Sequence, residues 1–166
     1  MSQKGTLTFF CGKMGAGKST MARKTASQTG ALLISEDQWL AGLYKDDIQN
    51  FADYLEYSSR LKAMLHTHIQ DILNAGISIV LDFPGNTERQ RAWFKDIFSA
   101  QAIPHKLIYL QASDELCLSQ IARRRQTQPE RARFDTEEVF HEVNQHFQPP
   151  SENEGFHVER VSKETE

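Results

Sequence analysis

The sequence has few cysteines and prolines and no long apolar run. Among its 166 residues are two cysteines, Cys11 and Cys117, and five prolines. Two thiols far apart in the chain, each inside an apolar stretch, fit a reducing compartment better than a disulfide-stapled secreted fold. The apolar stretch at residues 7–11 is too short for a secretory signal, and nothing approaches the roughly 18 apolar residues of a membrane span. We therefore expect a cytoplasmic protein with no membrane partner.

An excess of positive charge is also missing. The formal net charge is -3, so no chain-wide basic field would attract nucleic acid, although a local basic patch is still open. The length fits one globular domain of ordinary size. We expect a single domain over residues 1–166, acting as a monomer or a homodimer, with nucleic acid an improbable partner.

Short apolar runs alternate with helical segments along the chain. Strands are expected at residues 6–11, 31–35, 77–83, 106–112 and 156–161. Helices are expected at residues 18–30, about 51–75, 87–101, 113–125 and 136–147, the third of these with Thr87 as its N-cap. Apolar strands separated by helices indicate a parallel sheet that is covered on both faces. The pattern therefore predicts a three-layer α/β fold.

The most specific motif lies between the first strand and the first helix. Residues 12–19, GKMGAGKS, match G-x-x-x-x-G-K-[ST] in full. In such a loop, glycines let backbone N–H groups surround a polyphosphate, and the following helix points its N-terminus at the anion. Lys18 would reach the β- and γ-phosphates, and the Ser19 hydroxyl would ligate Mg²⁺. The predicted ATP-binding residues are Gly12, Lys13, Met14, Gly15, Ala16, Gly17, Lys18, Ser19 and Thr20.

Two acidic positions follow strands, where ligands gather in open α/β sheets. Asp82 ends the third strand. In many proteins with a phosphate-binding loop of this type, an aspartate at that place holds Mg²⁺; the alternative is that Asp82 caps a turn. The next residue is Phe83, so the glutamate with which many ATPases activate water is absent. Asp37 follows the second strand and suits a base that orients an acceptor hydroxyl. Its alternative is a helix N-cap, and Glu36 is the weaker candidate for the base.

Five arginines fall within eleven residues near the end of the fourth predicted helix. They are Arg123, Arg124, Arg125, Arg131 and Arg133. A solvated charged loop is one interpretation. The other is a mobile lid, at about residues 126–135, whose arginines clamp the transferred phosphate and exclude water.

With these motifs in place, the chain resembles the P-loop kinases, a group that includes adenylate and gluconate kinases. It is more similar to the AAA-type ATP-binding small kinases near polynucleotide kinase, chloramphenicol phosphotransferase and zeta toxin. The residues that carry the resemblance are GKMGAGKST, LISEDQW, VLDFPGNTERQRAW and the arginine lid, across residues 6–161. The resemblance implies a five-stranded parallel sheet of order 2-3-1-4-5.

The resemblance also implies roles for individual residues. Asp37 would accept the proton of the substrate hydroxyl, and Arg124 with Arg131 or Arg133 would contact adenine and phosphates. The acceptor would face Asp82, Asn86 and either Arg89 or Arg91. Relatives often carry an arginine at the position of Gln120, which leaves open which of residues 123–125 contacts the nucleotide.

Together these observations predict a kinase that transfers the γ-phosphate of ATP, with Mg²⁺, to a hydroxyl of a small molecule. One alternative is an ATP-binding regulator or slow ATPase without an acceptor, which would need neither Asp37 nor an arginine lid. Another is a polynucleotide 5′-kinase, which the negative net charge disfavours. The helix that carries Tyr54 and Tyr57 is either an ordinary amphipathic helix or a wall of the acceptor pocket.

Overall fold

The computed structural model describes residues 3–163. Its strands are β1 (Leu7–Cys11), β2 (Leu32–Ser35), β3 (Ile79–Asp82), β4 (His105–Ala112) and β5 (Val158–Lys163). Its α-helices are α1 (Lys18–Thr29), α2 (Glu36–Leu43), α3 (Phe51–Asn74), α4 (Glu88–Phe98), α5 (Asp114–Thr127) and α6 (Glu137–Asn144), and two short 3₁₀ turns are η1 (Pro129–Arg131) and η2 (Glu152–Glu154). Within the described range, none of the helices combines the length and the apolar character needed to cross a membrane.

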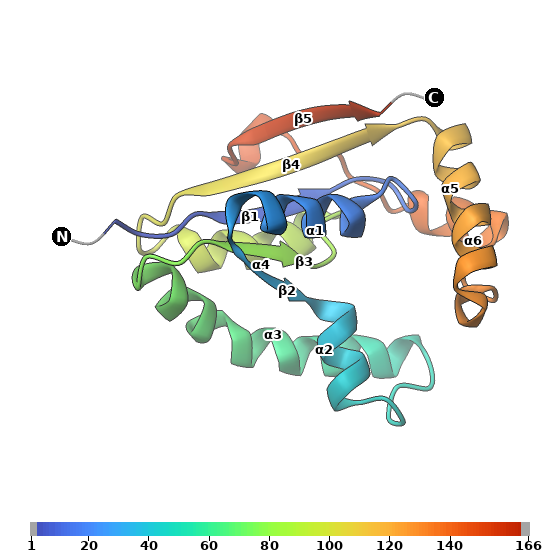
Figure 1. The fold of residues 1–166 in the computed structure, drawn as a ribbon, viewed down its shortest axis with the longest axis horizontal. Coiled ribbons are helices and arrows are strands. Elements are labelled where there is room, and N and C mark those ends of the chain that lie inside the picture. The colour runs from blue at the N-terminus through green and yellow to red at the C-terminus, as the bar shows by residue number, and fades with distance from the viewer. Residues whose placement is uncertain (1–2, 164–166) are drawn as a thin grey trace.

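The five strands form one parallel sheet in the order β2-β3-β1-β4-β5, which confirms the predicted order (Figure 1). The register places Ser35 level with Asp82 and Ala112 level with Lys163. Because all strands run the same way, their carboxyl ends meet at one edge of the sheet. Figure 1 shows α5 and α6 beyond that edge, past the arrowheads of the strands.

Each face of the sheet carries its own buried core. Leu7 and Phe9 point to the face covered by α3 and α4, where Leu65, Phe94 and Ile97 pack. On the other face, Phe10 packs in a second core against α1, α5 and α6. Alternate side chains of one strand point to opposite faces, so a fully buried strand such as β1 serves both cores. The prediction of helices on both faces is confirmed.

The predicted elements are present, but their ends shift. Thr87 caps α4 as expected, and Gln90 completes a capping box with it. The largest difference lies in the arginine-rich segment, where α5 continues to Thr127 and η1 follows at Pro129–Arg131. Helix α6 ends at Asn144, earlier than the expected residue 147. The segment expected as a loop is therefore ordered in short helical turns.

Candidate functional site

The loop after β1 has the backbone shape that its glycines predict. Gly15 and Gly17 adopt φ of 79° and 93°, in the left-handed region that other residues rarely enter. Gly17 is the N-cap residue of α1 and has no side-chain cap, so no capping side chain occupies the first N–H groups of the helix. This arrangement presents free donors and a positive helix end to an anion.

Other residues of the motif hold the loop in place. Lys13 pairs with Asp114 of α5 at 2.9 Å, and the amide of Met14 donates to Asn144 Oδ1 of α6 at 3.3 Å. The amide of Ala16 donates to the Lys13 carbonyl at 3.0 Å. The loop is therefore anchored to both helices that lie beyond the edge of the sheet.

Lys18 points back into this loop. Its ammonium donates to the carbonyl of Gly12 and, at 3.0 Å, to that of Lys13. Burial lowers its pKa to about 8, since no carboxylate among residues 3–163 pairs with it directly and Asp82 raises the pKa only from a distance. A polyphosphate would supply the negative charge that this cation lacks.

Ser19, Asp82 and Asp37 gather at the carboxyl edge of the sheet. Burial raises the pKa of the Asp82 carboxyl; a hydrogen bond from Ser19 opposes this effect, and the nearby charge of Asp37 adds to it. A hydroxyl and two carboxylates suit Mg²⁺, which takes few protein ligands and completes its shell with water and phosphate. In residues 3–163 no cluster of three or more His, Cys, Asp or Glu could hold a metal without such help.

The two acids after β2 differ in their surroundings. Ser35 is the N-cap of α2, so Asp37 is not the cap, and its carboxylate is exposed. Glu36 is only 1% exposed and accepts hydrogen bonds from Tyr54 Oη at 2.5 Å and Ser58 Oγ at 2.7 Å. Glu36 is therefore tied to α3, and Asp37 is the acid that a substrate can reach.

The lid arginines share an acid that sequence analysis missed. Arg124 forms two hydrogen bonds with the buried carboxylate of Asp135, at 2.7 and 2.5 Å, and Arg131 reaches the same group at 3.3 Å. Burial tends to raise the pKa of Asp135, but the hydrogen bonds and charges of both arginines outweigh it and lower the pKa. Arg133 instead lies over the Phe134 ring at 4.6 Å, and of these two arginines Arg131 lines the cleft; the predicted contact of either with the nucleotide stays a prediction.

These groups line one open cleft of about 820 Å³ at the carboxyl edge of the sheet. The predicted residues that line it are Gly15, Gly17, Lys18, Ser19, Thr20, Asp37, Asp82, Arg124 and Arg131. Arg123 and Gln120 line it too, so Gln120 occupies the cleft where relatives often place an arginine. Lys163 was not predicted: the end of β5 brings its ammonium against Gly17, where a β-carbon would lie 2.5 Å from Nζ. A fifth parallel strand must end at this edge, and that is the signal that could have pointed to Lys163.

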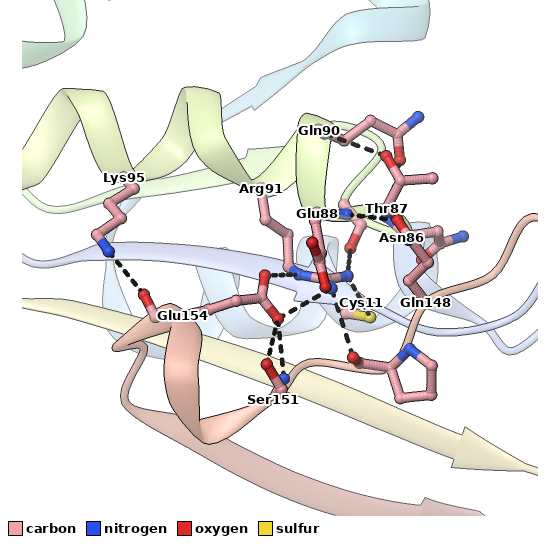
Figure 2. Close-up of polar contacts among 12 residues, drawn as sticks. Cys11, Asn86, Thr87, Glu88, Gln90, Arg91, Lys95, Gln148, Ser151 and Glu154 are labelled. Carbon is pink, nitrogen blue, oxygen red and sulfur yellow. Dashed lines mark hydrogen bonds and ion pairs between the residues drawn. The ribbon is translucent and has the colours of Figure 1, made fainter.

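Arg91, one of the two arginines predicted to face the acceptor, is buried inside the protein. Its side chain is 0% exposed and donates to Glu154 at 2.7 and 3.1 Å and to the carbonyl of Gly85 at 3.0 Å. Figure 2 shows this guanidinium enclosed between α4, Cys11 and the segment before β5. Its charge is already neutralised inside the protein, so it cannot face an acceptor.

The neighbours of Arg91 in the sequence lie elsewhere. Asn86 supports the phosphate loop, because its Oδ1 accepts a hydrogen bond from the Gly12 amide at 3.0 Å. Its predicted role toward the acceptor stays a prediction. Arg89 is exposed and lines a second cavity, between α3 and α4.

The fold and the cleft define a P-loop nucleoside triphosphate-binding protein. A family model described as an AAA domain matches residues 7–150, and the chain belongs to that family of P-loop kinase-like domains. No curated protein matches the sequence.

Three solved structures share the fold. A candidate kinase from Chloroflexus aurantiacus is 18% identical, with a TM-score of 0.72 over 96% of this chain and 86% of its own. A sugar kinase from Janibacter is 13% identical, with a TM-score of 0.63 over 95% and 85%. The APS kinase CysC of Mycobacterium tuberculosis, solved with AMPPNP and APS, is 18% identical, with a TM-score of 0.65 over 99% and 91%. At these identities the likeness establishes the P-loop kinase fold.

Proposed function

We propose that this protein is a kinase that transfers the γ-phosphate of ATP to a hydroxyl group of a small molecule. The observation that carries the proposal is the position of Asp37. This exposed carboxylate lines the same cleft as Lys18, Ser19 and two lid arginines. A protein that only binds ATP needs no free carboxylate at that place. The kinase fold of the solved relatives supports the same conclusion.

The cleft supplies each part that phosphoryl transfer requires. Lys18 and the loop amides would hold the β- and γ-phosphates, and Arg124 and Arg131, which line the cleft, would contact the phosphates as the lid closes. The acceptor oxygen would attack the γ-phosphorus from the side of Asp37, forming a new P–O bond while the bond to the β-phosphate oxygen breaks. ADP leaves, and the hydroxyl proton passes to the Asp37 carboxylate. Positioning and charge stabilisation account for most of the expected rate.

The residues present also fit a magnesium ion. Ser19 and Asp82 would hold it, Ser19 directly and Asp82 through water. When bound, it would neutralise the charge that develops on the phosphate oxygens.

The two buried free thiols, Cys11 and Cys117, support a cytoplasmic location, and the oligomeric state is left open between monomer and homodimer.

The test compares Asp37→Asn with wild type in two measurements. ATP affinity, measured by titration, should stay near normal, because Lys18 and the loop hold the phosphates. Transfer of labelled γ-phosphate to an acceptor fraction should fall by about 10²–10⁴-fold, the usual contribution of a positioned base. Asp47→Asn, an exposed aspartate that does not line the cleft, serves as the control.

Normal transfer by Asp37→Asn would remove Asp37 from the mechanism. The absence of transfer to any acceptor, with slow ATP hydrolysis unaffected by the substitution, would favour the regulator or slow ATPase. Transfer only to nucleic-acid 5′ ends would favour the polynucleotide kinase.

A further inference from the structure

A second cavity lies beside the cleft, between α3 and α4. Its volume is about 660 Å³. The residues on which the argument depends are Tyr54, Ser58 and Lys62 of α3 and Arg89 and Trp93 of α4. Both helix segments lie near the carboxyl edge of the sheet, because α4 begins just after β3 ends and the first half of α3 packs beside α2. The cavity therefore opens on the same side of the molecule as the phosphate loop.

Two adjacent residues of α2, Glu36 and Asp37, lie between the two cavities. Glu36 accepts hydrogen bonds from Tyr54 and Ser58, which line the second cavity, and the next residue, Asp37, lines the cleft. Burial and the charge of Glu36 raise the pKa of Tyr54, so its hydroxyl stays protonated and continues to donate. The charge of Asp37 also raises the pKa of Tyr54, so the second cavity lies close to the acid that lines the cleft.

Two cations line this cavity, Lys62 of α3 and Arg89 of α4. Among residues 3–163, neither Lys62 nor Arg89 takes part in an ion pair. Burial lowers the pKa of Lys62; the charge of Glu36 acts the other way, and that of Arg89 lowers it further. Glu36 keeps its negative charge, but its two oxygens accept hydrogen bonds from Tyr54 and Ser58 and neither forms an ion pair with Lys62 or Arg89. Two like charges beside one cavity are a cost that a bound anion would remove.

The cavity also has an aromatic wall. The Trp93 ring packs against Phe83, with centroids 5.1 Å apart, and the Lys62 ammonium lies 5.6 Å from the Trp93 centroid. An aromatic ring beside two cations offers an apolar surface for the body of a ligand and charges for its anionic end.

Resting on the kinase function proposed above, we propose that this cavity binds the phosphate acceptor and that the acceptor carries an anionic group, held by Lys62 and Arg89. The acceptor would be a carboxylate, sulfate or phosphate compound that also bears the reactive hydroxyl. Its anion would sit between α3 and α4, and its hydroxyl would reach past Glu36 to Asp37. A neutral sugar or alcohol would leave both cations unpaired.

Sulfate is a suitable probe for the cavity itself. The protein carries Trp39→Phe, so that Trp93 is its single tryptophan. It is saturated with Mg·AMPPNP to fill the phosphate loop. Sulfate is then titrated while Trp93 fluorescence is followed. We expect a saturable change that is weakened by about 10-fold or more in Lys62→Met and in Arg89→Met, because each loses a hydrogen bond between charged groups.

Arg60→Met is the matched control for the sulfate titration. Arg60 lies on α3 two residues from Lys62, pairs with Glu56 and lines neither cavity. Sulfate binding in this variant should match wild type. The absence of a saturable response in wild type, or an equal response in the Lys62 and Arg89 variants, would overturn the anion site.

Labelled transfer then separates this proposal from the proposed function. The small molecules of a cell extract are divided by anion exchange into retained and unretained fractions, and each is incubated with the protein and γ-labelled ATP. Transfer to the retained fraction, lost in Lys62→Met and kept in Arg60→Met, supports an anionic acceptor. Transfer only to the unretained fraction overturns the anionic acceptor while leaving the kinase intact. No transfer to either fraction counts against the kinase itself, and so against this proposal as well.

Discussion

Two arginine–carboxylate clusters of this protein have similar chemistry and opposite burial. In the first, Arg91 is 0% exposed and its partner Glu154 is 14% exposed. In the second, Arg124 and Arg131 are 30% and 37% exposed, and it is the acid, Asp135, that is buried. Figure 2 shows the first cluster between α4 and the segment before β5. The second lies at the open end of the cleft.

The difference in burial separates a structural pair from one that can change partners. Arg91 is fully buried, so losing Glu154 would leave a buried charge. Arg124 and Arg131 reach solvent and the cleft, so one of them can turn to a phosphate while the other continues to neutralise the buried Asp135 carboxylate. A cation that serves a ligand must be able to exchange partners, and exposure of the arginine side is what permits it.

The largest effect should come from breaking the first cluster. Arg91→Met should lower the free energy of unfolding by about 3–5 kcal/mol, because Glu154 then loses its partner in a largely buried place. The measurement is urea unfolding followed by circular dichroism. Lys106→Met is the control, since it breaks an exposed pair with Glu159 and should cost no more than about 1 kcal/mol. Equal costs in the two variants would show that burial of the arginine does not matter.

The second cluster should show its role in nucleotide binding. Arg124→Met should weaken Mg·AMPPNP binding by about 10–100-fold, the range expected for one charged hydrogen-bond donor to phosphate. Arg133→Met should leave the affinity unchanged, because Arg133 lies over Phe134 outside the cleft. Calorimetric titration of both variants makes the comparison. Equal losses would mean that Arg133 enters the cleft when nucleotide binds.

Removing the acid of the second cluster should cost less than breaking the first. Asp135→Asn should lower the free energy of unfolding by only about 1 kcal/mol, since both arginines can turn to water. The folded-state pKa of Asp135 is lowered, so its contribution is complete above the ordinary aspartate pKa of about 3.9 and is lost as the pH falls through the folded value. The difference between wild type and variant should therefore stay constant from neutral pH to about pH 5 and shrink below about pH 4. Urea unfolding at several pH values tests this, and a gap that widens in acid would contradict it.

The smallest expected effect concerns Lys18. Its buried ammonium donates to the backbone carbonyls of Gly12 and Lys13. Burial lowers its pKa to about 8, and bound phosphates should raise it again. ATP binding near pH 8 should then take up a fraction of a proton, and affinity should fall as the pH rises above 8, by at most about tenfold per unit. Calorimetry in two buffers of different ionisation enthalpy measures the uptake. Lys18→Arg stays charged and should show none; uptake that persists in this variant would assign the proton to another group.

Local pattern was enough to predict most of the fold. The apolar runs, the glycines at the helix ends and the cap at Thr87 gave every strand and nearly every helix, because each of these signals acts within a few residues. The strand order came from the resemblance to P-loop kinases, and the structure confirms it. The lid was harder, since Arg124 and Asp135 are eleven residues apart and no short-range pattern pairs them.

Within the candidate site, the sequence determined the phosphate loop and the two acids at the strand ends. The full G-x-x-x-x-G-K-[ST] pattern between a strand and a helix is specific for a polyphosphate-binding loop, and parallel strands must end at one edge. The sequence could not show which of Arg89 and Arg91 is accessible to a ligand. A shift of two positions along a helix changes whether a side chain faces a cavity or the core. Tertiary structure alone brought Lys163 against Gly17 and placed Lys62 beside Arg89, since those contacts join segments that are far apart in the chain. Burial then decided which charges are free to meet a ligand, because a cation enclosed with its own acid has nothing left to bind.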